Sequence, residues 1–253
     1  MKQAIKSTAA LLAGAACVPV VASGASLAAS VEPRAWLSLS DQVRWSLASD
    51  ALLFTTASAI VCAPVVGAVI ASRYRDRRTD GRLLPAVIPL AAALSVFTIV
   101  SAMLTFAWRF GRGDEVLFVE RSHLTLFAAA AALAGIGALS SAWFRHTLDA
   151  AGFSVLLVIV ASVGMLVGGA GVGDLPRPVI TAGLAASPLI AMATAAEIDI
   201  VRSDLLYQIS PLAHMQIDYP TWSLASACYL AVACFCVLFL TADDRRMASA
   251  LPS

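Results

Sequence analysis

The chain has 253 residues, of which 60% are hydrophobic and 13% are charged, and its formal net charge is +1. Soluble domains average roughly 45–50% apolar and about 25% charged residues, so this composition excludes a soluble enzyme and indicates a protein whose solvent is largely lipid. The small net charge gives no reason to expect a nucleic-acid partner.

The first apolar run covers residues 8–29 and follows Lys2 and Lys6. Two interpretations stay open for it: a first transmembrane helix, or a cleaved secretory signal with a basic start, an apolar middle and small residues near its end. Both place the following residues, 30–50, on the outer side. At about 20 residues per spanning helix, the whole chain has room for five to seven spans.

The second apolar run, residues 51–71, leads directly into the charged segment 73–82, which holds five arginines in ten residues. Basic residues collect in cytoplasmic loops, so we expect this segment on the inner side. A third span is predicted from about residue 85 to residue 108. An outer loop is predicted for residues 109–122.

The fourth span is predicted for residues 123–144, with a tight inner turn at Arg145 and His146. The fifth is predicted for 148–171 and the last for 221–240. Residues 178–196 are apolar but interrupted by Pro188, and counting them as a full span gives seven spans, whereas counting them as a re-entrant or surface-lying element gives six. The distribution of Lys and Arg favours six spans with both ends inside.

The predicted fold class is therefore all-α: one polytopic membrane domain over residues 1–253, with about six transmembrane helices. An irregular or re-entrant outer element is expected at residues 174–218, before the last span. Its charged residues are expected at the outer interface, where Asp199 and Arg202 pair three positions apart on a helix. These outer interfacial residues are Glu197, Asp199, Arg202 and Asp204.

The chain offers little catalytic chemistry. Its two lysines both lie at the N-terminus, so no P-loop lysine is available to bind a nucleotide. His123 and His146 lie at opposite ends of one predicted span, and His214 stands before the last one, so we assign no metal site, cofactor or catalytic residue. The segment 73–82 has three interpretations: an orientation determinant, a contact for anionic lipid, or a docking surface for a cytoplasmic partner.

Three stretches of the chain resemble the ABC-2-type permeases, the membrane subunits of ATP-binding-cassette exporters. Residues 63–84 resemble the second span of that family and the charged inner segment that follows it. Residues 132–147 are similar to the fourth span and its short basic turn. Residues 198–214 look like the loop ahead of the last span.

The resemblance implies a permease subunit in a bacterial inner membrane, with both termini cytoplasmic if residues 8–29 are retained. It also implies a second permease chain and a separate ATPase that binds ATP and Mg²⁺. The alternative is a non-transporting accessory subunit of a larger membrane complex. The residues expected to couple the permease to the ATPase are Arg73, Arg75, Asp76, Arg77 and Arg78, with Arg145 and His146 as a second contact.

Overall fold

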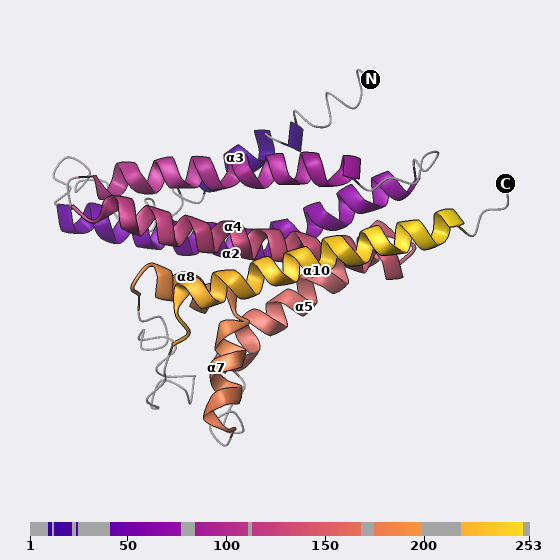
Figure 1. The fold of residues 1–253 in the computed structure, drawn as a ribbon. Helices are drawn as coiled ribbons and strands as arrows, with labels where there is room; N and C mark the ends of the chain where they lie inside the picture. The colour runs from indigo at the N-terminus through magenta and orange to yellow at the C-terminus, as the bar shows by residue number, and fades with distance from the viewer. Residues whose placement is uncertain are drawn as a thin grey trace.

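The regular secondary structure in the described part of the chain is entirely helical (Figure 1), which confirms the all-α class. The computed structural model describes residues 10–11, 13–21, 24, 41–76, 84–110, 113–167, 175–198 and 219–249. Its helices are α2 (Asp41–Asp76), α3 (Leu84–Arg109), α4 (Glu115–Trp143), α5 (Thr147–Val167), α7 (Arg177–Ala185), α8 (Pro188–Ala195) and α10 (Trp222–Ser249).

Five of these helices are long and apolar enough to cross a membrane, so the chain is an integral membrane protein. Within the predicted first run, residues 10–11 and 13–21 are also helical. Ala15 and Val18 of this run pack against a buried cluster that includes Leu52 and Phe97. The five spanning stretches are Ala48–Arg73, Val87–Ala107, Val116–Trp143, Thr147–Gly164 and Trp222–Ala242.

Three helices extend beyond the apolar runs that predicted them. α2 begins at Asp41 rather than at residue 51, and α10 continues to Ser249 rather than ending near residue 240. α4 begins at Glu115 rather than at residue 123, so the predicted outer loop 109–122 is wrong over most of its length. Polar residues are common in the added turns of α2 and α10, where backbone hydrogen bonds continue the helix beyond its apolar stretch. In α4, the added residues 116–119 are apolar and belong to the spanning stretch itself.

The predicted interruption at Pro188 is confirmed. α7 and α8 meet at an angle of 85°, and Ser187 stands between them as the N-cap of α8. The Ser187 hydroxyl donates to the carbonyl oxygen of Ser162 in α5 at 2.7 Å and accepts from the backbone N–H of Ile190. Because Pro188 occupies the first helical position, where no N–H is needed, the chain restarts as a helix at this point.

α4 is the central helix of the bundle. Its most apolar stretch is 72% buried, against 17% for the corresponding stretch of α3, and it packs against α2, α3, α5, α8 and α10. Small residues allow these contacts: a Cβ atom at Gly67 of α2 would overlap the backbone of Ala134 of α4. Gly135, one position further along α4, faces Cys236 of α10.

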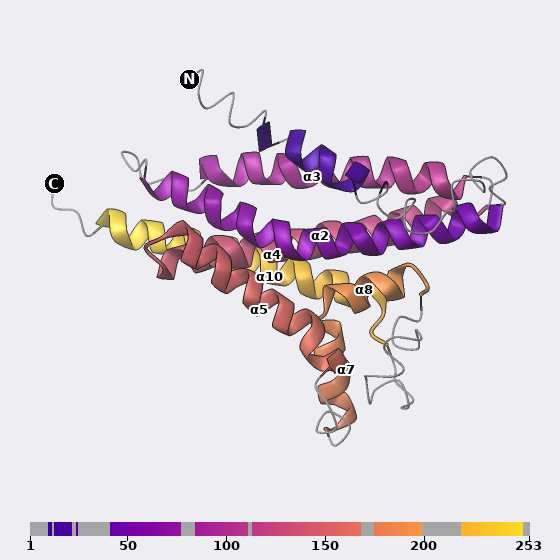
Figure 2. The ribbon, with the colours of Figure 1, turned by 180° about the vertical axis from the view of Figure 1, so that it is seen from behind.

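α2 and α10 end at the same end of the bundle, together with the turn between α4 and α5 (Figures 1 and 2). We call this the basic end and define it by Ser72, Arg73, Arg145, His146 and Thr147. α5 leaves this end and α10 returns to it. The bent pair α7–α8 therefore adds no complete crossing between them, in agreement with a re-entrant element before the last span.

Candidate functional site

At the basic end, the structure brings together two segments that lie 75 residues apart in sequence. The hydroxyl of Thr147, the first residue of α5, donates to the hydroxyl of Ser72 in α2 at 2.9 Å. Behind this hydrogen bond, Phe144 packs against a buried cluster that includes Ala68 of α2 and Ala150 of α5. The end of the second span and the α4–α5 turn therefore form one continuous surface.

The exposed side chains of this surface are those of Arg73, Arg145 and His146. Arg73 directly follows Ser72, and His146 directly precedes Thr147, so the hydrogen bond holds their backbones close together. Three of the seven residues that the resemblance singled out are thus placed on one face. Arg75 and Asp76 belong to the last turn of α2, but their side chains lie outside the described residues, as do Arg77 and Arg78 altogether.

The opposite end of the bundle holds a buried arginine that sequence analysis did not single out. Arg109, the last residue of α3, is 3% exposed, and its Nη2 donates to Oδ2 of Asp114 at 2.8 Å. Its guanidinium carbon lies 3.7 Å from the centre of the Phe118 ring, which is a close cation–π contact. The loop between α3 and α4 is short, because α3 ends at Arg109 and α4 begins at Glu115. This short loop brings Asp114 and Phe118 beside the Arg109 side chain.

A second arginine at this end connects α4 to the end of α8. Arg121 pairs with Glu197 at 2.7 Å, and Ser122 donates to the carbonyl oxygen of Ala195. The hydrogen bond from Arg121, supported by its charge, holds the pKa of the Glu197 carboxyl below its ordinary value. Glu197 is the only one of the four predicted outer interfacial residues in the described part of the chain; Asp199, Arg202 and Asp204 lie outside it.

His123, in α4, is buried against α3. Its Nδ1 lies 2.9 Å from the carbonyl oxygen of Val119, so Nδ1 carries the proton and donates. Nε2 then accepts from the Ser101 hydroxyl at 3.0 Å, with Thr105 at 3.4 Å. The ring is thus engaged in structural hydrogen bonds.

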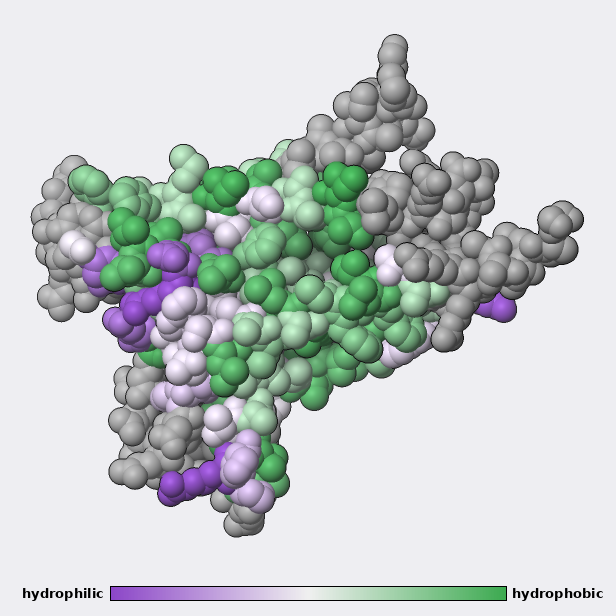
Figure 3. Space-filling model, in the orientation of Figure 1, coloured by the Kyte–Doolittle hydropathy of each residue, from purple (hydrophilic) through white to green (hydrophobic). Residues whose placement is uncertain are grey.

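Hydrophilic groups gather at this end of the molecule, while its flank is largely apolar (Figure 3).

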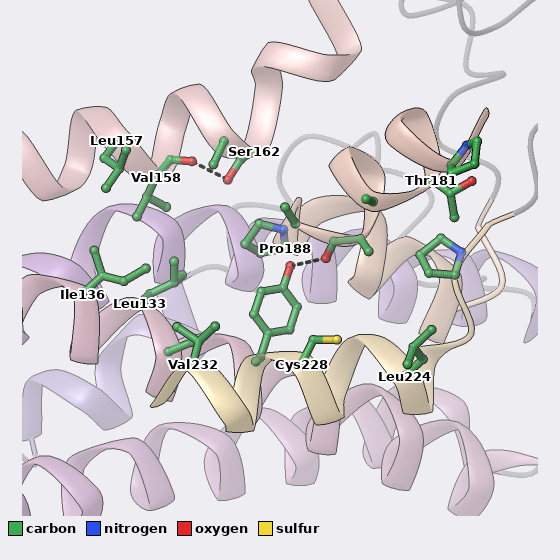
Figure 4. A pocket seen from close by; sticks show the side chains of 18 of the residues that line it. Leu133, Ile136, Leu157, Val158, Ser162, Thr181, Pro188, Leu224, Cys228 and Val232 are labelled. Carbon is green, nitrogen blue, oxygen red and sulfur yellow. Dashed lines mark hydrogen bonds between the residues drawn. The ribbon is translucent and has the colours of Figure 1, made fainter. Parts of the chain in front are cut away.

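A cavity of about 990 Å³ opens on the apolar flank, between α4, α5, α7 and α10 (Figure 4). Sequence analysis did not foresee it, because it exists only where α5 and α7 diverge from α10. Its volume lies at the upper end of the range of about 300–1,000 Å³ that is typical of ligand sites. Its lining includes Leu133, Ile136, Leu157, Val158, Thr181, Arg177, Leu224 and Val232.

No protein-family model, no curated protein and no solved structure matches the chain.

Proposed function

We propose that the chain is the permease subunit of an ABC-2-type exporter, driven by a separate ATPase that binds ATP and Mg²⁺. The observation that carries this proposal is the pairing of the two basic segments at one end of the bundle. A docking partner needs a surface made from several helices, because a single loop transmits force to few of them. The hydrogen bond between Ser72 and Thr147 supplies such a surface.

Movement of a bound ATPase would act on α2, α4 and α5 together. The end of α2 is tied to the first residue of α5, and Phe144 at the end of α4 packs between them. α2 also touches α4 directly in mid-span, where Gly67 lies against Ala134. A displacement at the basic end therefore passes into the centre of the bundle, where ATP binding to the partner would favour one arrangement of two permease chains over another.

The element before the last span also supports the proposal. Its bent pair, α7 and α8, packs against α5 and against the central helix α4. α8 is almost completely buried, and Arg121 and Ser122 of α4 hold its C-terminal end. A buried, broken element that lies beside the central helix suits a permease whose outer half rearranges during transport.

Isolation of the complex from native membranes tests the proposal. The tagged chain is solubilised in mild detergent and captured at low and high salt, and the proteins that accompany it are identified. We expect an ATPase with a P-loop at low salt and less of it at high salt, because exposed charge pairs are screened over about 8 Å at 0.15 M salt. Capture without any ATPase at low salt would overturn the proposal and leave the accessory-subunit alternative.

A further inference from the structure

We propose that the cavity between α4, α5, α7 and α10 binds one anionic phospholipid of the surrounding bilayer. The acyl chain would lie along the aliphatic part of the cavity, and the headgroup phosphate would lie at Arg177. This inference does not rest on the proposed transport function.

The position of the cavity makes lipid its natural occupant. Three of its walls are formed by α4, α5 and α10, which are membrane-spanning helices. Leu157, Leu224 and Val232 line it and are 46%, 57% and 40% exposed, so the cavity opens on the flank that faces the hydrocarbon. A cavity that opens there is filled by acyl chains rather than by water.

The lining has little capacity to bind a polar ligand along most of its length. The Ser162 hydroxyl donates to the carbonyl oxygen of Val158 at 2.7 Å, and the Tyr229 hydroxyl donates to that of Ala185 at 3.1 Å. These hydroxyl protons are therefore used within the protein. The surfaces around them are aliphatic, with Ile136 and Leu157 at the end of the cavity away from Thr181 (Figure 4).

The side of the cavity formed by α7 carries polar side chains that could bind a headgroup. Arg177 and Thr181 lie four residues apart on α7, hence on the same face of the helix, and both line the cavity. No ion pair joins Arg177 to any residue in the part of the chain that the structure describes. A guanidinium and a hydroxyl beside an aliphatic cavity complement the phosphate and the acyl chain of an anionic lipid.

Photocrosslinking of the full chain tests this assignment. The purified protein is reconstituted in phosphatidylcholine vesicles that contain a small fraction of phosphatidylglycerol with a photoreactive group on its acyl chain. Crosslinked peptides are mapped by mass spectrometry, with unlabelled phosphatidylglycerol or phosphatidylcholine as competitor. We expect crosslinks concentrated in α5, α7 and α10, and stronger competition by phosphatidylglycerol.

Two variants with matched controls make the test specific. Arg177→Gln should lower the preference for phosphatidylglycerol about fivefold, the effect of one basic residue near a membrane surface. Arg177→Lys, which keeps the positive charge at the same position, should retain that preference. Ala182→Phe fills the cavity and should reduce crosslinking several-fold, whereas Ala142→Phe, on an exposed part of α4 outside the cavity, should not.

Three outcomes would overturn the inference. One is crosslinking spread evenly over the exposed helices; another is an Arg177→Gln variant that keeps the preference for phosphatidylglycerol. The third is oxidative crosslinking of two copies through Cys228, which lines the cavity, because a second copy would then cover this face. If Ala182→Phe does not fold, the competition experiment with the unaltered protein and Arg177→Gln still decides.

Discussion

Gly137 of α4 lies so close to Pro64 of α2 that a Cβ atom at position 137 would overlap the Pro64 carbonyl oxygen. The reverse contact, Gly67 of α2 on Ala134 of α4, lies nearly one turn away on each helix. In lipid, apolar burial contributes little to helix association, so close packing of helix backbones is a main source of the attraction between helices. This crossing holds the span that ends at the basic end against the central helix.

The Gly137→Ala substitution should destabilise the protein, because the new methyl group meets a backbone carbonyl that cannot rotate away. Overpacking of this kind costs about 1–3 kcal/mol. Gly152→Ala in α5 is the matched control, since a Cβ atom there meets nothing within 4 Å. Thermal unfolding in detergent should show a lower midpoint for the first variant only, and equal midpoints would refute the close crossing.

Arg109 should tolerate neither Gln nor Lys. Gln removes the charged hydrogen bond from Arg109 to Asp114, and a hydrogen bond to a charged group contributes about 1.5–3 kcal/mol. Lys keeps the charge but cannot stack a flat guanidinium on Phe118. Thermal unfolding should show both variants below the unaltered protein, while Arg145→Gln, an exposed arginine at the other end, stays level with it. A Lys variant of full stability would show that charge alone suffices.

The ion pair between Arg121 and Glu197 should make stability depend on pH. Because the pKa of Glu197 is lowered in the folded protein, its contribution is present above the ordinary carboxyl pKa of 4.5 and is lost as the pH falls through the folded-state value. Glu197 is 63% exposed, so the effect is at most about 1 kcal/mol.

Comparison with Glu197→Gln isolates this contribution. Between pH 7 and pH 3, the thermal midpoint of the unaltered protein should fall more than that of Glu197→Gln, since the variant has no carboxylate to protonate at this site. Other carboxylates, Asp114 included, are common to both proteins and cancel in the difference. Parallel midpoint curves for the two proteins would contradict a stabilising pair.

Both Gly81 and Ser253 should be cytoplasmic. The prediction follows from the five arginines at 73–82 and from the shared end of α2 and α10. Single cysteines at the two positions, in a background without the five native cysteines, should resist a membrane-impermeant thiol reagent in intact cells and react after permeabilisation. Reaction of the Ser253 cysteine alone in intact cells would support seven spans instead of six.

Much of the fold could be predicted because spanning helices are read from long apolar runs. Residues 85–108 and 148–171 correspond closely to α3 and α5, and Pro188 marks the break between α7 and α8. The start of α4 at Glu115 could not be read in this way, because Glu120, Arg121 and Ser122 separate the apolar residues 116–119 from the long apolar run that follows His123.

The candidate sites were predictable to different degrees. The density of arginines pointed to Arg73, and the short turn pointed to Arg145, but their proximity depends on a hydrogen bond between residues 75 positions apart. Arg109 lacked a distinguishing pattern, since its burial results from the loop that precedes α4. The cavity was beyond prediction, because no local pattern reports how far α5 and α7 diverge from α10.

Charge reversal in the segment 73–82, which begins at Arg73 of the basic end, is the sharpest test of the proposed docking of an ATPase. One exposed pair contributes only about 0–1 kcal/mol, so Arg75, Arg77 and Arg78 are changed to Glu together. Insertion must be verified, because these arginines also help to set orientation. The measurement is the amount of ATPase captured with the correctly inserted triple variant. We expect its loss, whereas capture equal to that of the unaltered chain would show that this segment does not couple the permease to an ATPase.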